Sequence, residues 1–158
     1  MAAGTGMYEV QRETVIDAPA ASVCRELVDF HRWKDWSPWE DVDPAMERTF
    51  SGTDSGVGAV YAWQGNRKAG AGRMEIVDVT EQSQVRIDLE FLKPFKAHNK
   101  IDFSLSSGDD GTRVTWTMTG RKTFMTRVMG IFTSMDKLVG KDFEKGLAQL
   151  KAEVEAGT

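Results

Sequence analysis

The chain has 158 residues, of which 41% are hydrophobic and 28% are charged, and its formal net charge is −4. This length suits a single domain over residues 1–158, with a core large enough to need no disulfide or metal cross-link. The acidic balance argues against nucleic acid as a partner, and no apolar run approaches the about 18 residues of a membrane-spanning helix.

The single cysteine, Cys24, excludes an internal disulfide and fits a reducing compartment. Its position on the apolar stripe of an expected helix favours a small buried side chain over a reactive thiol. The N-terminal stretch MAAGTGMYEV lacks the apolar segment of a signal peptide. We therefore expect a cytoplasmic protein.

The first elements are a strand and two short helices. Residues 7–16, MYEVQRETVI, predict a strand whose apolar face is interrupted by Arg12. A helix is expected to start at Asp17-Ala18-Pro19, because proline is tolerated in the first helical turn. The stretch WKDWSPW at 33–39 follows, with three of the chain's five tryptophans, and predicts a short helix that runs into a proline-containing loop.

From about residue 45 the hydrophobic pattern changes to a period of two, which is typical of strands. The clearest alternation places Val85, Ile87, Leu89 and Phe91 on an inward face. Six further strands are expected at residues 45–51, 57–65, 70–80, 84–91, 97–105 and 112–120.

Residues 134–155 carry one helical stripe and predict a long amphipathic helix of roughly 30 Å. Gly140 and Gly146 lie inside it and indicate a very close neighbour, because each glycine costs the helix about 1 kcal/mol relative to alanine. Together the elements predict an α+β fold, in which a curled seven-stranded antiparallel sheet surrounds the C-terminal helix and two short helices separate strands one and two. One helix does not fill such a sheet, so a cavity is expected beside it.

This arrangement resembles the START-like helix-grip superfamily, in particular the polyketide cyclase/dehydrase and lipid transport (SRPBCC) branch. The resemblance is carried by DAPAASVCRELVD at 17–29, WKDWSPW at 33–39, GVGAVYAWQGN at 56–66, GAGRMEIVDV at 70–79, GTRVTWTMTG at 111–120 and MDKLVGKDFEKGLAQLK at 135–151. It covers nearly the whole chain in the right order and implies the helix-grip fold. It does not select an activity, because one fold hosts many functions.

Motifs for catalysis or metal binding are missing from the sequence. The two histidines, His31 and His98, have no metal-ligand spacing. No nucleophile motif is present, and the glycines at 56–59 and 70–72 are interpreted as bends in the sheet. We therefore expect no metal and no cofactor, and we assign no catalytic residue.

Two charged residues fall on faces that are otherwise apolar. Asp78 shares the predicted face of Met74 and Ile76, and we expect it to meet solvent near the strand's end. Arg12 is expected either to pair with Asp78 or an inner glutamate, or to recognise an anionic ligand group.

Asn99 is the most informative polar residue, since it lies between Ala97 and Ile101 on an apolar face. Such an amide either bonds to neighbouring backbone or orients a ligand in a hydrophobic pocket. Large side chains on the same inner faces form either core or pocket wall. The candidate ligand-binding residues are Trp36, Trp39, Tyr61, Trp63, Met74, Phe91, Asn99, Phe103, Trp116 and Phe132.

The tryptophan stretch passes the open end of the sheet in the helix-grip order. Its indoles either plug that end as core, line the rim of a ligand site, or form a partner surface. Residues 121–134, with Phe132, are expected either to close the cavity as a short helix or to connect elements.

The function hypothesis is binding of a small apolar or aromatic molecule, lipid or polyketide-like, between sheet and helix. One alternative is a cyclase/dehydratase-type enzyme that uses inward polar groups to move protons. Another is a protein-interaction module like the chaperone activators of the superfamily, which needs a filled interior and an exposed apolar patch.

Overall fold

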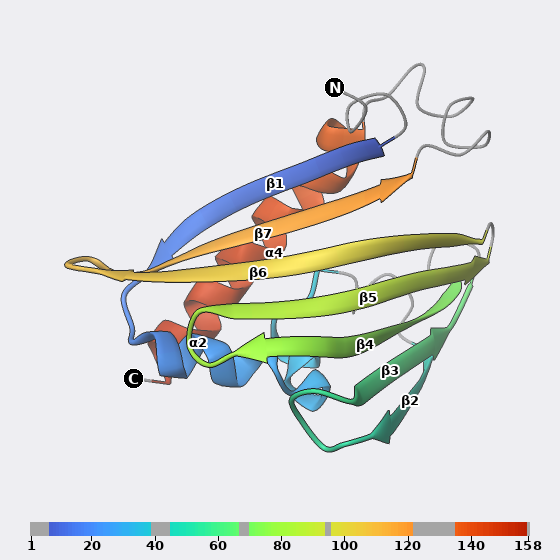
Figure 1. The fold of residues 1–158 in the computed structure, drawn as a ribbon, viewed down its shortest axis with the longest axis horizontal. Helices are drawn as coiled ribbons and strands as arrows, with labels where there is room; N and C mark the ends of the chain where they lie inside the picture. The colour runs from blue at the N-terminus through green and yellow to red at the C-terminus, as the bar shows by residue number, and fades with distance from the viewer. Residues whose placement is uncertain (1–6, 39–44, 67–69, 94–95, 122–134, 158) are drawn as a thin grey trace.

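The computed structural model describes residues 7–38, 45–66, 70–93, 96–121 and 135–157. Seven strands form one antiparallel sheet in the order β1-β7-β6-β5-β4-β3-β2, so the first strand pairs with the last (Figure 1). The strands are β1 (Met7–Ile16), β2 (Glu47–Gly52), β3 (Ala59–Gln64), β4 (Ala71–Thr80), β5 (Gln84–Lys93), β6 (Ala97–Gly108) and β7 (Gly111–Arg121). The predicted seven-stranded sheet is confirmed.

Helix α4 (Met135–Ala156) lies across one face of this sheet, behind β1, β7 and β6 in Figure 1. The short helix α2 (Ala20–Leu27) and the 3-10 helix η1 (Phe30–Asp35) connect β1 with β2, as the sequence predicts. They sit beside α4 on the same face, which we call the inner face. Within the described ranges, no helix is long and apolar enough to span a membrane.

The two glycines of α4 bring the helix close to the sheet, as expected. A Cβ at Gly146 would lie 2.9 Å from both the Trp116 ring and the Pro38 ring. One turn earlier, Phe143 stacks on Trp116 with ring centroids 4.1 Å apart and an interplanar angle of 9°. Gly140 faces the guanidinium of Arg12, whose Nε binds Glu144 Oε2 at 2.8 Å.

Arg12 thus forms an ion pair with Glu144 of the helix and not with Asp78, the other partner that the sequence suggested for this arginine. Thr14 and Val10 continue the inner face of β1 on either side of it. Because the aliphatic stem of arginine packs on apolar surface while its head stays wet, Arg12 fits an inner position at the margin of the helix.

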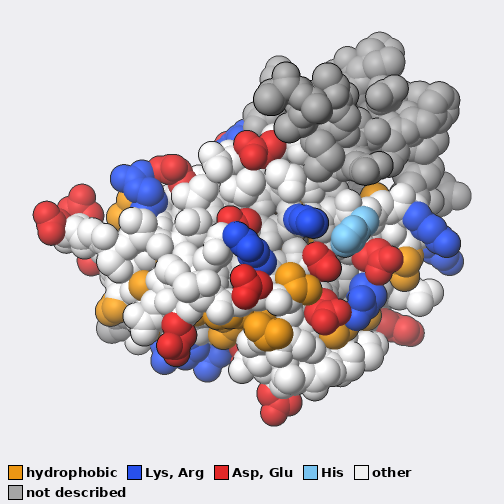
Figure 2. All heavy atoms as spheres, in the orientation of Figure 1, with side chains coloured by type: hydrophobic (Ala, Val, Ile, Leu, Met, Phe, Trp, Pro, Cys, Tyr) orange, Lys and Arg blue, Asp and Glu red, His pale blue; other side chains and the backbone are white. Residues whose placement is uncertain are grey.

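The alternation predicted in β5 is confirmed. Val85, Ile87 and Leu89 are buried and Phe91 is half-buried, whereas Arg86 and Glu90 are exposed. The opposite, outer face of the sheet carries acidic and basic side chains with smaller hydrophobic areas between them (Figure 2). This face is therefore the solvated side of a half-buried sheet.

The inner placement predicted for Asp78 is wrong. The pairing of β4 with β5 shifts by one residue between Ile76 and Asp78, so Asp78 lies opposite Arg86, and Val79 instead packs against the core. A β-bulge of this kind reverses which side chains face inward beyond it. Asp78 is exposed and 3.8 Å from Arg86, so it does meet solvent as expected.

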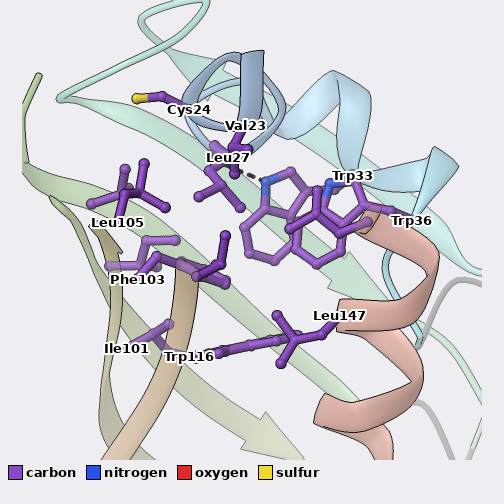
Figure 3. Close-up of a cluster of buried hydrophobic side chains, with 14 of the residues drawn as sticks. Val23, Cys24, Leu27, Trp33, Trp36, Ile101, Phe103, Leu105, Trp116 and Leu147 are labelled. Carbon is purple, nitrogen blue, oxygen red and sulfur yellow. Dashed lines mark hydrogen bonds between the residues drawn. The ribbon is translucent and has the colours of Figure 1, made fainter. Parts of the chain in front are cut away.

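The main core fills the space between α2, η1, α4 and the middle of the sheet (Figure 3). Trp33 and Trp36 from η1 and its C-cap meet Phe103 of β6 and Trp116 of β7, all at most 2% exposed. The Trp36 ring centroid lies 4.6 Å from that of Trp33, 6.2 Å from that of Phe103 and 5.7 Å from that of Trp116. Leu27 of α2 and Leu147 of α4 close the cluster.

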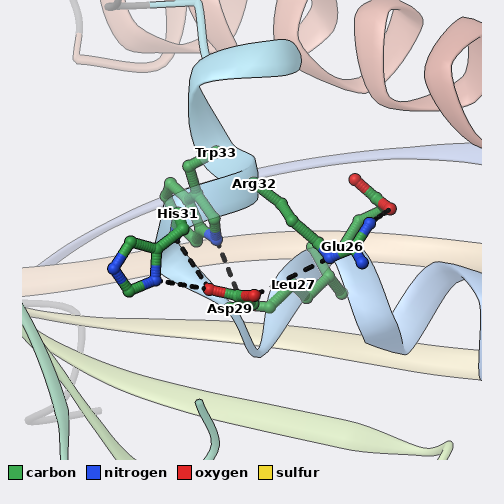
Figure 4. A network of polar contacts seen from close by, with 6 residues as sticks. All are labelled: Glu26, Leu27, Asp29, His31, Arg32 and Trp33. Carbon is green, nitrogen blue, oxygen red and sulfur yellow. Dashed lines mark hydrogen bonds and ion pairs between the residues drawn. The ribbon is translucent and has the colours of Figure 1, made fainter. Parts of the chain in front are cut away.

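Hydrogen bonds around η1 hold this tryptophan pair in place (Figure 4). The Asp29 side chain accepts a hydrogen bond from the His31 backbone N–H at 2.9 Å and so caps η1. Trp33 Nε1 donates to the Leu27 carbonyl at 3.1 Å. Arg32 binds the buried Glu26 carboxylate at 3.1 Å, which ties η1 to α2.

Alanine substitutions at the two α4 glycines are predicted to differ. Gly146→Ala should lower the free energy of unfolding by about 1–3 kcal/mol, as overpacking of a full core does, because Trp116 and Pro38 have no room to move. Gly140→Ala should lie within about 1 kcal/mol of wild type, since the end of Arg12 can swing aside and alanine favours the helix. Urea denaturation of both variants measures this, and equal losses would contradict the packing described for Gly146.

Candidate ligand-binding site

One end of the inner face is built around two strand glycines, and we call it the glycine end. It lies at the right-hand end of the sheet in Figure 1, where β1, β4 and β6 begin and β3, β5 and β7 end. Its residues are Tyr8, Trp63, Gly72, Met74, Leu89, Phe91, Asn99 and Gly120. The strand register brings them together, because Tyr8 and Asn99 both pair with Gly120, and Trp63 and Phe91 both pair with Gly72.

Gly120 allows a polar contact across the strand that separates Tyr8 from Asn99. The Tyr8 hydroxyl donates a hydrogen bond to Asn99 Oδ1 above the bare backbone of Gly120. A Cβ at Gly120 would collide with Asn99 Oδ1 and lie 2.8 Å from the Tyr8 hydroxyl oxygen. Glycine is thus required here by a close approach rather than by a turn.

The Tyr8–Asn99 pair lies in a poorly hydrated setting. Asn99 is 3% exposed and Tyr8 is half-buried. Burial raises the pKa of Tyr8 to about 12, because the phenolate would lose its hydration. The phenol therefore stays protonated near neutral pH and keeps donating to Asn99.

Gly72 likewise leaves room for a side chain of a neighbouring strand, here the indole of Trp63, which also contacts Phe91. A Cβ at Gly72 would lie 2.6 Å from Trp63 Cη2, so the indole lies directly over the glycine. Trp63 meets Phe91 edge to face, with centroids 5.9 Å apart and an interplanar angle of 87°. Edge-to-face contacts of this geometry are favourable between aromatic rings.

The apolar side chains of the glycine end are covered less completely than the main core. Trp63, Met74 and Phe91 are partly buried residues at the margin of the core, and Leu89 between them is 6% exposed. Together with Asn99 and Tyr8 they form an apolar surface with one polar pair. Small-molecule sites in proteins have this composition.

The sequence-predicted site residues divide between the two regions. Trp63, Met74, Phe91 and Asn99 lie at the glycine end, whereas Trp36, Phe103 and Trp116 lie in the main core. Tyr61 is 4% exposed and lies between them, with its ring centroid 5.8 Å from Phe30 and 6.2 Å from Trp63. Trp39 and Phe132 lie outside the described residues, as does the segment 122–134.

The burial of Trp33 and Trp36 supports a core role for the part of the tryptophan stretch that the structure describes. Trp36 is 1% exposed, and its Nε1 is buried without a hydrogen-bond partner in the described part of the chain. An unpaired buried N–H is costly. The ring contacts of Trp36 must therefore outweigh this loss, and a direct ligand contact by Trp36 stays a prediction.

Tyr8 is the site residue that the sequence analysis missed. Tyr8 stands one residue after the start of the first strand, far in sequence from Asn99, and only the register of β1 with β7 brings the two together. A signal was present in GAGRMEIVDV and GTRVTWTMTG, whose glycines interrupt strand patterns. Such glycines mark close approach as well as bends.

Three carboxylates from separate elements meet beside α2. Glu26, Asp35 and Glu153 each place one oxygen within 4.8 Å of the others, and oxygen ligands suit Ca²⁺ and Mg²⁺. Arg32 already binds Glu26, which offsets part of this charge. We assign no metal here, since acidic side chains commonly gather without an ion. The cluster was not predictable from the sequence, because Glu153 lies more than a hundred residues after Glu26 and Asp35.

Comparison with known proteins places the chain in a structural context. The sequence model of a family described as polyketide cyclase/dehydrase and lipid transport matches residues 7–155. No curated protein sequence matches significantly.

Several solved structures share the fold. Protein CV1439 from Chromobacterium violaceum is 14% identical with a TM-score of 0.67, and the match covers 93% of this chain and 96% of that one. Protein Ms6760 from Mycobacterium smegmatis is 19% identical with a TM-score of 0.65 and coverages of 95% and 92%. MLL2253 from Mesorhizobium loti is 18% identical with a TM-score of 0.64 and coverages of 92% and 98%. At these identities the likeness shows the fold alone.

The raised pKa of Tyr8 predicts a pH dependence of stability. Unfolded Tyr8 loses its proton near pH 10, whereas folded Tyr8 holds it to about pH 12, so the folded state binds more protons between these values. The stability contributed by this difference is complete below about pH 10 and falls as the pH rises. Urea denaturation from about pH 9 to about pH 11 should show a steeper loss for wild type than for Tyr8→Phe. Parallel losses would contradict the burial of the phenol.

Proposed function

Because the chain belongs to the polyketide cyclase/dehydrase and lipid transport family, we propose that it binds a small hydrophobic or aromatic molecule at the glycine end of the inner face. The observation that carries this proposal is the partial burial of Trp63, Met74 and Phe91 beside a polar pair that is itself mostly buried. An apolar molecule placed there covers hydrophobic side chains that α4 and η1 leave partly exposed. Each square ångström of apolar surface so removed from water contributes about 25 cal/mol.

The two glycines support the same proposal by shaping the surface. Because Gly72 and Gly120 have no side chain, the inner surface of the sheet is depressed at these two positions, and larger side chains of the neighbouring strands surround them. The Trp63 ring lies over the first and contacts Phe91 at its edge, and the Tyr8–Asn99 hydrogen bond crosses the second. The ligand we propose lies against these contacts, with its apolar body on the aromatic side and its polar group near Asn99.

Binding is favoured over proton-transfer catalysis by the chemistry of the polar pair. General acid–base catalysis works best when the pKa of the catalytic group is near the working pH. Asn99 does not titrate, and Tyr8 has a pKa of about 12. Arg12 is held by Glu144 against α4. These described groups suit the orientation of a ligand better than the movement of protons.

In this proposal the aromatic residues have separate roles. Trp63 and Phe91 contact the ligand, whereas Trp36, Phe103 and Trp116 form the packed core that supports the site. The core residues remain candidates for ligand contact only if the ligand displaces one of their rings.

A pair of alanine variants tests this division with the uncharged fluorescent probe N-phenyl-1-naphthylamine. Trp63→Ala should weaken the binding of this probe about tenfold, as loss of an aromatic anchor does, and change the free energy of unfolding by about 1 kcal/mol. Trp36→Ala, the matched core variant, should lower the free energy of unfolding by about 3–5 kcal/mol. Fluorescence titration and urea denaturation of both proteins give the four quantities.

Two results would count against the proposal. Wild-type protein that shows no saturable probe binding at micromolar concentration would remove its basis. Weaker binding after Trp36→Ala, with folding stability unchanged, would move the site from the glycine end to the tryptophan stretch.

A further inference from the structure

The amide of Asn99 has hydrogen-bonding capacity that the described residues leave unused. Its Oδ1 accepts from the Tyr8 hydroxyl, and this is the one hydrogen bond of the Asn99 side chain among residues 7–38, 45–66, 70–93, 96–121 and 135–157. An asparagine amide carries two N–H donors on Nδ2. Asn99 is 3% exposed, and Nδ2, unlike Nε1 of Trp36, is not fully buried, so its donors lie at the small part of the residue that remains accessible.

The hydrogen bond from Tyr8 determines that the amide nitrogen of Asn99, and not its oxygen, is available to a ligand. The Tyr8 hydroxyl donates, so the amide oxygen turns toward β1 across Gly120 and the nitrogen turns away from it. On the other side, Asn99 pairs with Leu89 of β5, whose side chain offers no acceptor. The free donors thus belong to the same surface as Leu89, Phe91 and Trp63.

We propose that Asn99 Nδ2 is the donor that selects an uncharged ligand oxygen, a carbonyl above all, on an otherwise hydrophobic ligand. This inference rests on the proposed function and specifies it. A ligand that covers Nδ2 without supplying an acceptor buries an unpaired N–H, which costs free energy, so a ligand with an acceptor gains relative to one without. Tyr8 is the positioning residue that holds the amide in the donating orientation.

An uncharged oxygen fits this site better than a carboxylate. A buried carboxylate needs a positive partner, because its own dehydration is costly. Among the described residues of the inner face, the arginine of β1, Arg12, is already engaged: its Nε donates to Glu144 at 2.8 Å and its Nη1 donates to the Gln11 carbonyl at 2.8 Å. The amide–phenol pair is itself neutral near pH 7, since Tyr8 stays protonated.

Three naphthalenes of matched shape test the inference. 2-Acetylnaphthalene carries the carbonyl, 2-isopropenylnaphthalene replaces its oxygen with a methylene group, and 2-naphthoate adds a charge. Their affinities for wild type, Asn99→Leu and Tyr8→Phe are measured by displacement of N-phenyl-1-naphthylamine. The quantity of interest is the affinity of the ketone relative to that of the alkene, because this ratio cancels changes that affect both ligands alike.

Asn99→Leu should lower the ketone-to-alkene ratio about three- to tenfold, the worth of one neutral hydrogen bond. Tyr8→Phe should lower the ratio less, because the donor remains and only its orientation is released. 2-Naphthoate should bind wild type more weakly than the ketone. An unchanged ratio in Asn99→Leu, or naphthoate as the tightest ligand, would overturn the inference.

Failure of the inference is distinguishable from failure of the proposed function. If neither neutral naphthalene binds wild type, the proposed function fails. If both bind but Asn99→Leu weakens them equally, the site stands and the donor role of Asn99 falls.

A measurement on wild type alone avoids dependence on the folding of the variants. The carbonyl stretch of ¹³C-labelled 2-acetylnaphthalene should shift to lower frequency on binding than in an apolar solvent, as hydrogen bonding to the oxygen requires. A bound frequency equal to that in the apolar solvent would overturn the inference.

Discussion

Helix α4 alone covers only part of the inner face of the seven-stranded sheet. Which residues form packed core and which form the candidate site depends on what covers the remaining part. Helix α4 approaches closely because Gly146 leaves room for Trp116 and Pro38, and Phe143 stacks on the same indole. Helix η1 brings Trp33 and Trp36 to the neighbouring part of the face and fills it. At the glycine end the coverage is incomplete, and large apolar side chains remain partly accessible.

Glycines within strands give this end its character. Residues on two strands that flank a third are normally separated by the side chain of the middle strand, because that side chain contacts both of its cross-strand neighbours. A glycine on the middle strand removes this separation. At Gly120 the gap admits a hydrogen bond between Tyr8 and Asn99, and at Gly72 it admits an aromatic contact between Trp63 and Phe91. The same local rule therefore yields one polar and one apolar contact on a single surface, which is the combination that ligand recognition requires.

The sequence predicts the fold well, because the period of two in the strands and the helical spacing of residues 134–155 are both strong. The glycines of α4 also predicted a close helix contact, which the structure confirms. The prediction fails at Asp78, where a one-residue bulge reverses the inward face, since no period in the sequence records a shift in pairing. Asn99 was recognisable as an amide on an apolar face, but its partner was not, because Tyr8 lies 91 residues away and reaches it across an intervening strand. Nor does a period of two distinguish Trp63, at the margin of the core, from Trp116 in its centre; only the position of α4 and η1 does so.

The central claim is that ligands bind at the glycine end and leave the packed core in place. The indole N–H resonances of a ¹⁵N-labelled sample report on this directly, because each of the five tryptophans contributes one signal that a Trp→Phe variant assigns. Titration with N-phenyl-1-naphthylamine should move the Trp63 signal while those of Trp36 and Trp116 stay in place. Saturable shifts at Trp36 or Trp116 with an unmoved Trp63 signal would contradict the account and place the ligand within the aromatic core.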